Sequence, residues 1–279
     1  MFFLIKNIDI RGANALSAYP VASGVSPLAV AGFVRNLAIM LGVDFSENLG
    51  FSIVHHNTHI KAEDTGFKPI PLQKIGALLT CSSAGKPGST DYSSGSMSLS
   101  LQPVIECDTH LSVIIDFVDI SVSKEEINNI IPTMRIAGGQ IQAYEGVYEY
   151  EDFGLAIKRV GPGYAYTDRS DDLLKGEAKN RVMAFVEHLY PTYLPSEHIL
   201  KTQSRENKSA WIVPFNLGWL PLTDFKQSAG SRKGFDHAYV EPLVGLVELL
   251  PARKAIYERT PIIWKRKKMN GAYVVTTNV

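Results

Sequence analysis

The sequence of 279 residues has little cysteine, no excess charge of either sign and no long apolar run. Its two cysteines, Cys81 and Cys107, make neither a CxxC pair nor a disulfide framework, which indicates reduced thiols in a cytoplasmic protein. The apolar runs, such as 111–118, are broken by polar residues and fall short of the roughly 20 residues that span a membrane. Lys6 and Asp9 end the first apolar run so early that we expect no signal peptide.

The 28 basic and 28 acidic side chains cancel, which argues against a protein whose whole surface attracts nucleic acid. The charges are nevertheless segregated along the chain. Acidic residues gather in 145–152 and 168–172, and basic residues gather in 253–259 and 265–268. This distribution is typical of a protein that presents one basic face to RNA and other faces to protein partners.

Signatures of catalysis and of metal binding are missing as well. The chain has neither a GxSxG elbow nor a Walker loop, and the glycine pairs at 138–139 and 161–163 are too short to cradle a phosphate by motif. Three histidines at 55–59 have Asp64 nearby, but no further residue stands at a metal-ligand spacing. We therefore expect no metal and no cofactor, and the seven histidines leave RNA cleavage open at this point.

Hydrophobic periodicity in the first half predicts a β-α-β-β-(β)-α-β order. A helix is predicted from a Ser26 cap with Pro27 in its first turn to the stop at Gly42. A second helix begins at the Ser123 cap, and Pro132 kinks it or ends it early. Strands are predicted around residue 8 and at 51–63, 97–105, 110–120 and 140–150.

The second half is less regular, and 81–96 in the first half is the clearest loop, dense in serine and glycine. We predict a helix within 171–190, a short strand at 211–215, a helix or apolar segment at 240–250 and a last strand at 273–277. Neither an internal repeat nor a linker divides the chain. One elaborated domain over 1–279, with a core at 1–160 and an extension at 161–279, is therefore favoured over two domains.

Five blocks of this sequence resemble, in the same order, the Cas-five-type subunit, or second Csy protein, of type I-F CRISPR surveillance complexes. The first block is IDIRGANALSAYPVASGVSPLAVAGFVRNL, at 8–37. The others are MRIAGGQI at 134–141, GPGYA at 161–165, AWIVP at 210–214 and EPLVGLVE at 241–248. Their colinearity over most of the chain makes the resemblance specific.

The resemblance implies an α+β fold: a ferredoxin-like (RRM/RAMP-type) antiparallel sheet with helices on one face, plus an insertion or thumb and a C-terminal extension. It also implies a non-catalytic subunit that holds the 5′ handle of crRNA. Its protein partners would be the large subunit and the first backbone subunit, and target DNA would be reached through the complex.

Arg11, Asn14 and Arg35 belong to the first matching block and are candidates for RNA contact. His55 and His59 are further candidates, because alternation along a strand would place both on one face. The pair Gly138-Gly139 allows two interpretations. It is a helix C-cap, or it is a turn over which RNA backbone passes, with Arg135 beside it for a phosphate.

Four consecutive cations, Lys265, Arg266, Lys267 and Lys268, follow Trp264. One interpretation is a solvated hairpin turn that leads to the turn signal at 270–271. The other is a phosphate-tracking tip with Trp264 as a stacking ring. A weaker pair of the same kind, Arg232 and Lys233, stands in a loop.

Two other functions remain open at this point. A ferredoxin-like RNA-processing endonuclease would use His55 or His59 as its general base. A purely structural partner protein would neither bind nor cut RNA.

Overall fold

The computed structural model describes residues 1–17, 21–43, 49–64, 69–71, 73–75, 101–117, 122–173, 211–227 and 235–278. Their strands pair into one 12-stranded sheet, and two further strands, β3 (Ala62–Asp64) and β4 (Pro69–Pro71), pair with each other. Among the helices of these ranges, none is long and apolar enough to cross a membrane.

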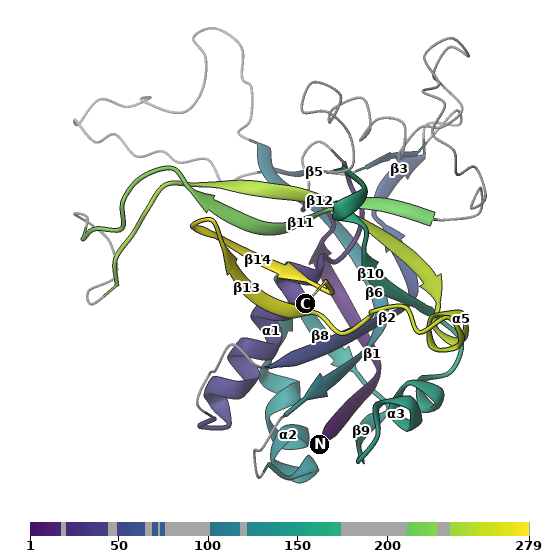
Figure 1. The fold of residues 1–279 in the computed structure, drawn as a ribbon. Coiled ribbons are helices and arrows are strands. Elements are labelled where there is room, and N and C mark those ends of the chain that lie inside the picture. Colours follow the sequence, from purple (N-terminus) through teal and green to yellow (C-terminus); the bar gives the residue numbers. More distant parts are fainter. Residues whose placement is uncertain are drawn as a thin grey trace, which may run out of the picture.

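The first half of the chain builds the antiparallel centre of the sheet (Figure 1). Strands β2, β6, β1 and β8 are neighbours in that order, and each adjacent pair is antiparallel. Strand β9 pairs with the same edge of β1 as β8 does, nearer the start of β1. The elements are β1 (Phe2–Asn14), α1 (Pro27–Met40), β2 (Gly50–Ile60), β5 (Gln73–Ile75), β6 (Leu101–Asp116), α2 (Lys124–Ile130), β7 (Arg135–Ile136), β8 (Gly139–Ala143) and β9 (Gly146–Tyr150).

Both predicted helix starts are confirmed. The Ser26 hydroxyl accepts a hydrogen bond from the backbone N–H of Ala29 at 3.2 Å, and Pro27 opens α1. Ser123 forms a capping box with the glutamate three residues later at the start of α2. Helix α2 ends before Pro132, which lies in a short 3₁₀ helix, so the predicted early end is also confirmed.

Strand β6 is continuous, so the predicted division into two strands at 97–105 and 110–120 is wrong. Cys107, Thr109 and Leu111 are buried, whereas Asp108 and His110 point to the other, more exposed face. A half-buried strand alternates in this way, and the polar residues at 106–110 therefore continue the strand instead of breaking it.

Helices cover both faces of the central strands, and the prediction of helices on one face only is wrong. Phe3 and Ile5 of β1 lie in the cluster that α1 and α2 complete, whereas Leu4 lies in a second cluster with α3 (Phe153–Val160) and α5 (Ala252–Tyr257). Figure 1 shows α1 and α2 on one side of β1 and α3 and α5 on the other. Because side chains alternate along β1, neighbouring residues supply two separate cores.

The second half extends the sheet and bends it back on itself. The path from β2 runs through β10, β12, β11, β14 and β13, and a backbone bridge between Trp264 and Phe51 joins the start of β13 to β2 again. The six strands therefore form a closed ring. Their bounds are β10 (Tyr164–Asp168), β11 (Trp211–Pro221), β12 (Val240–Pro251), β13 (Lys265–Met269) and β14 (Ala272–Thr276), and a 3₁₀ turn spans Ser170–Leu173.

Residues 240–250 belong to strand β12, so of the two predicted alternatives, a helix or an apolar segment, the helix is wrong. The residues at 245–250 are buried in succession because both faces of β12 are covered, and such a run cannot be distinguished from a buried helix by its periodicity. The predicted strand at 211–215 extends to Pro221, and the one at 140–150 divides into β8 and β9. The loop predicted at 81–96 and most of the helix predicted within 171–190 lie outside the described residues.

Candidate nucleic-acid interface

Three exposed side chains from three neighbouring strands lie in one row across the sheet. Arg11 of β1 is the register partner of Gln140 of β8, and Gln140 is the partner of Arg135 of β7. Register partners point to the same face of a sheet. Their chain neighbours Ile10 and Ile141 are buried under the opposite face. The structure thus brings the two predicted arginines together on one exposed face.

The turn between β7 and β8 supports this row. Ala137 and Gly138 both have positive φ angles, of 50° and 79°, as a two-residue hairpin turn of type I′ requires. The Arg135 guanidinium donates a hydrogen bond to the Gly138 carbonyl at 3.2 Å, and the Asn14 N–H donates to the Ala137 carbonyl at 2.9 Å. The helix C-cap considered for these glycines is wrong, because the glycines close a β-hairpin.

Gly139 has a packing role. A Cβ atom on Gly139 would lie 2.7 Å from the Ala13 backbone nitrogen and 2.7 Å from the Ile10 Cγ2 atom. The residue is buried between β8 and β1, so the prediction that RNA backbone passes over Gly139 is wrong. Gly138 is exposed, and a Cβ atom there would meet nothing within 4 Å.

Asn14 is the last residue of β1, and its side chain stabilises the turn that follows the strand. Its Oδ1 atom accepts a hydrogen bond from the Leu16 N–H at 2.9 Å, an arrangement that turns the chain out of the strand. Its register partner is Glu106 of β6, which pairs with Lys61 at 3.0 Å. Half-buried Asn14 therefore lies beside an ion pair at the edge of the exposed face.

A β-bulge in β2 separates His55 from His59. His55 is the register partner of Leu111, but Asn57 is already the partner of the next residue of β6, so His56 is an extra residue in β2. Beyond the bulge, His59 is the partner of Asp108 and lies on the exposed face with it. The prediction that His55 and His59 share a face is therefore wrong.

His55 points into the core side of the sheet. Its ring stacks on Tyr166 with 6.2 Å between centroids, and its Nε2 atom hydrogen-bonds the Thr58 hydroxyl at 2.7 Å. Burial, and then the charge of nearby His56, lower the pKa of His55 from 6.5 to about 4. His55 is therefore a neutral, packed side chain near pH 7.

The exposed face also holds groups that sequence reasoning did not single out. His110 of β6 has its Nε2 atom 3.7 Å from the Asp9 Oδ1 atom, and Gln140 stands between the two arginines of the row. His56 is fixed by hydrogen bonds to the Pro162 carbonyl at 2.8 Å and to the Ser112 hydroxyl at 2.7 Å. Recognising that β6 continues through 106–110 would have placed His110 on this face.

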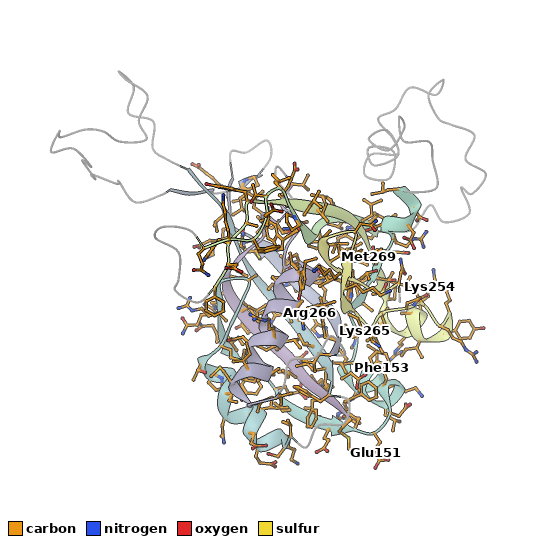
Figure 2. All side chains as sticks on the ribbon, turned by 60° about the vertical axis from the view of Figure 1, so that its left-hand side comes forward. Glu151, Phe153, Lys254, Lys265, Arg266 and Met269 are labelled. Carbon is orange, nitrogen blue, oxygen red and sulfur yellow. The ribbon has the colours of Figure 1, made fainter. Side chains whose placement is uncertain are left out.

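The four consecutive cations lie along strand β13, and the turn signal after them is confirmed at Asn270-Gly271, where both φ angles are positive. Figure 2 shows Lys265 and Arg266 on this strand. The Lys267 ammonium donates a hydrogen bond to the Asn278 carbonyl at 3.0 Å, and the Arg266 guanidinium lies 5.8 Å from the centre of the Tyr273 ring. The cations thus lie along strand β13 instead of forming a tip.

Trp264 has no exposed surface, so its predicted role as a ring that stacks on RNA is wrong. Its side chain belongs to the main hydrophobic core, and its indole N–H donates a hydrogen bond to the Tyr166 carbonyl. A buried tryptophan normally pairs its N–H in this way.

The comparison with protein families agrees with the resemblance of the five sequence blocks. A family model described as CRISPR-associated protein (Cas_Csy2) matches residues 3–275. The chain belongs to this family. It is therefore a type I-F Csy subunit and a component of a multi-subunit CRISPR complex. No curated protein matches it.

The remaining predicted site residues of this Csy2-family chain do not join the row. Arg35 is exposed on the outer side of α1, which covers the opposite face of the sheet from Arg11. Arg232 and Lys233 lie outside the described residues. Within the described ranges, no group of three or more His, Cys, Asp or Glu side chains is placed to hold a metal ion.

Proposed function

We propose that this Csy2-family subunit binds the 5′ handle of crRNA on the exposed face of the sheet, along the row of Arg11, Gln140 and Arg135. The observation that carries the proposal is the register that aligns two arginines across β1, β8 and β7. Arginine donates paired hydrogen bonds to phosphate, and glutamine can both donate to and accept from a base edge. An exposed row of these three groups therefore suits single-stranded RNA.

The strand order supports a ferredoxin-like module of the RAMP type at the centre of this chain. In that fold the first and third strands are central, the second and fourth lie outside them, and all neighbours are antiparallel. The order β2-β6-β1-β8 has this arrangement, with β1 and β6 at the centre. The 12-stranded sheet joins this module to the C-terminal strands, which supports a single elaborated domain and the Cas-five-type assignment.

The proposed role is binding without cleavage. His55, the first candidate general base, is packed against Tyr166, and its pKa of about 4 makes it a weak base. His59 lies on the other face, so the two histidines do not converge on one bond. The proposed protein partners are the large subunit and the first backbone subunit, and target DNA is reached through the assembled complex.

The test measures handle binding and RNA cleavage on the same samples. Fluorescence anisotropy of labelled handle RNA is followed against salt for the full chain and for the double variant Arg11→Gln/Arg135→Gln. The matched control is Arg35→Gln/Arg253→Gln, which removes the same charge from exposed positions on α1 and α5.

We expect the Arg11/Arg135 variant to bind more weakly, with a log–log salt slope reduced by about 0.7 for each lost phosphate contact, while the control binds like the wild type. Equal losses in both variants would refute the assigned face. If the wild-type chain cuts the RNA and a variant with His55, His56 and His59 replaced by alanine does not, the subunit is an endonuclease. If the wild-type chain binds no handle RNA, either alone or in its complex, the subunit is a purely structural partner protein.

A further inference from the structure

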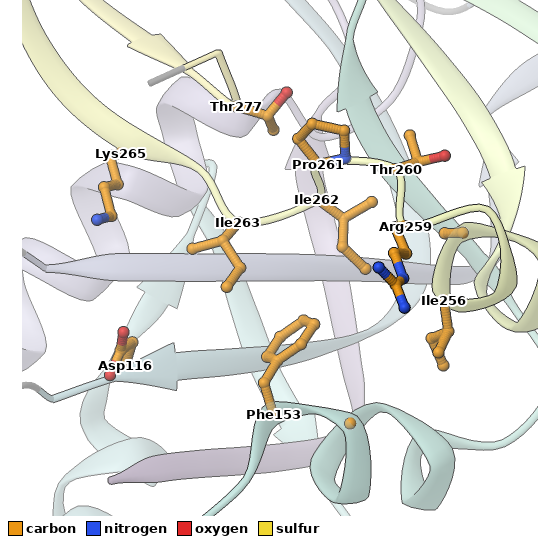
Figure 3. A pocket seen from close by; sticks show the side chains of 12 residues that line it. Asp116, Phe153, Ile256, Arg259, Thr260, Pro261, Ile262, Ile263, Lys265 and Thr277 are labelled. Atoms are coloured by element: carbon orange, nitrogen blue, oxygen red, sulfur yellow. The ribbon is translucent and has the colours of Figure 1, made fainter.

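A cavity of about 450 Å³ opens on the face of the sheet that α3 and α5 cover, and none of its lining residues belongs to the Arg11 row. Figure 3 shows its layout: Phe153 and the isoleucines 262 and 263 lie in the middle, with Arg259 at one end and Lys265 at the other. Asp116, at the end of β6, lies beside the Lys265 end. The pocket is thus apolar in the middle, with the cation Arg259 at one end and the oppositely charged side chains of Lys265 and Asp116 at the other.

Hydrogen bonds hold the wall of this pocket in place. The segment 259–264 follows α5, and its Thr260 N–H donates to the Ala255 carbonyl at 2.9 Å. The Thr167 hydroxyl donates to the Pro261 carbonyl at 2.6 Å, and the Ser52 hydroxyl donates to the carbonyl of residue 262. An extended segment whose carbonyls are fixed from two strands gives a preformed pocket, which reduces the entropy cost of binding.

The surroundings of the pocket are basic and carry exposed apolar side chains. On α3 and α5, Lys158 and Arg253 are exposed, and so are the large side chains of Leu155 (54%) and Tyr257 (89%). Exposed apolar side chains next to a preformed apolar pocket mark a surface for another macromolecule. The cations select an occupant of negative charge.

We propose that this pocket receives one apolar side chain from an acidic segment of a protein partner. The side chain would fill the space between Phe153 and Ile263, and carboxylates flanking it would pair with Arg259 and Lys265. The pocket does not involve the Arg11 row, so this inference is independent of the RNA-binding proposal. If the subunit fails to bind handle RNA, the peptide proposal is unaffected, and if the pocket fails to bind the peptide, the RNA proposal is unaffected.

The lining favours a peptide over RNA. Among the described residues that line the pocket, the walls are mainly aliphatic, and the single aromatic ring, Phe153, already makes an edge contact with Phe2 at 5.6 Å between centroids. Single-stranded RNA is normally held by stacking on exposed rings.

The test uses the full chain with ¹³C-labelled isoleucine methyl groups, which report on the pocket through Ile256, Ile262 and Ile263. The probes are an acidic pentapeptide with leucine at its centre, the same peptide with basic residues in place of the acids, and a hexanucleotide of single-stranded RNA. The variant is Arg259→Gln/Lys265→Gln. Its matched control is Arg35→Gln/Lys226→Gln, which removes the same charge from exposed positions that do not line the pocket.

We expect the acidic peptide at millimolar concentration to shift the three pocket methyl signals while those of buried Ile8 and Ile10 stay in place. The pocket variant should bind this peptide about fivefold more weakly at low salt, and the control should bind it like the wild type. Unmoved pocket signals, or equal shifts with the basic peptide, would overturn the proposal. Pocket shifts with the RNA and none with the acidic peptide would assign the pocket to nucleic acid instead.

Discussion

The indole N–H of Trp264 donates a hydrogen bond to the backbone carbonyl of Tyr166 at a distance of 3.0 Å. Trp264 also exchanges two backbone hydrogen bonds with Phe51, at 2.7 and 3.0 Å. The residue before the basic strand β13 is thereby tied to β10 through its side chain and to β2 through its backbone. The position of the four cations therefore depends on the buried indole ring of Trp264, which RNA cannot reach.

Replacing Trp264 by alanine should lower the free energy of unfolding by about 3 to 5 kcal/mol, because a fully buried indole leaves a cavity and an unpaired Tyr166 carbonyl. Urea unfolding at constant temperature measures the loss. The matched control is Trp211→Ala, whose ring is 54% exposed and which should cost about 1 kcal/mol or less. Similar losses for the two variants would contradict this packing.

The two glycines of the β7–β8 hairpin should respond differently to alanine. Gly139→Ala places a methyl group against the backbone of β1 and should cost about 1 to 3 kcal/mol through overpacking. Gly138→Ala has open space but a φ of 79°, and should cost about 1 kcal/mol. Thermal and urea unfolding of both variants show which substitution lowers the free energy of unfolding more. A larger decrease for Gly138→Ala than for Gly139→Ala would refute the prediction.

Neutralising Lys265, Arg266, Lys267 and Lys268 together should weaken crRNA or DNA binding by the complex and flatten its salt dependence by about 0.7 to 0.9 per lost phosphate contact. Exposed Lys268 should account for more of this change than half-buried Lys267, because the Lys267 ammonium is bonded to the Asn278 carbonyl. Binding titrations of the Lys268→Gln and Lys267→Gln variants across salt measure the two contributions. An unchanged slope in the quadruple variant would show that β13 meets no phosphate.

His55 should make the stability of this subunit fall in mild acid. Its pKa is about 4 in the folded state and 6.5 in the unfolded chain, so the unfolded state binds the proton first as the pH falls. The contribution is complete above pH 6.5 and is lost between about 6.5 and 4, with a slope of at most about 1.4 kcal/mol per pH unit. Urea unfolding from pH 7.5 to 4.5 should show a shallower slope for His55→Leu than for wild type. Parallel curves would contradict the buried, neutral ring.

Sequence patterns predicted what depends on neighbours along the chain. The Ser26 and Ser123 caps, the early end of α2 at Pro132 and the turn at Asn270-Gly271 were all predicted correctly. Caps and tight turns use groups within about four residues of one another, so local residue types are sufficient to specify them. The same holds for the apolar stripe that makes α1 a surface helix.

Tertiary pairing decided the candidate site. Arg11 and Arg135 are far apart in sequence, and the register of β8 between their strands places them in one row. One extra residue in β2 moves His59 to the face opposite His55, and the ladder with β6 reveals this bulge. Trp264 is buried in a core built by residues distant in sequence, and it bonds Phe51 of β2 and Tyr166 of β10. Sequence alone therefore determined the helix caps, the turns and the family, whereas long-range strand pairing decided which charged and aromatic side chains face solvent, because a one-residue shift in register reverses every side chain that follows.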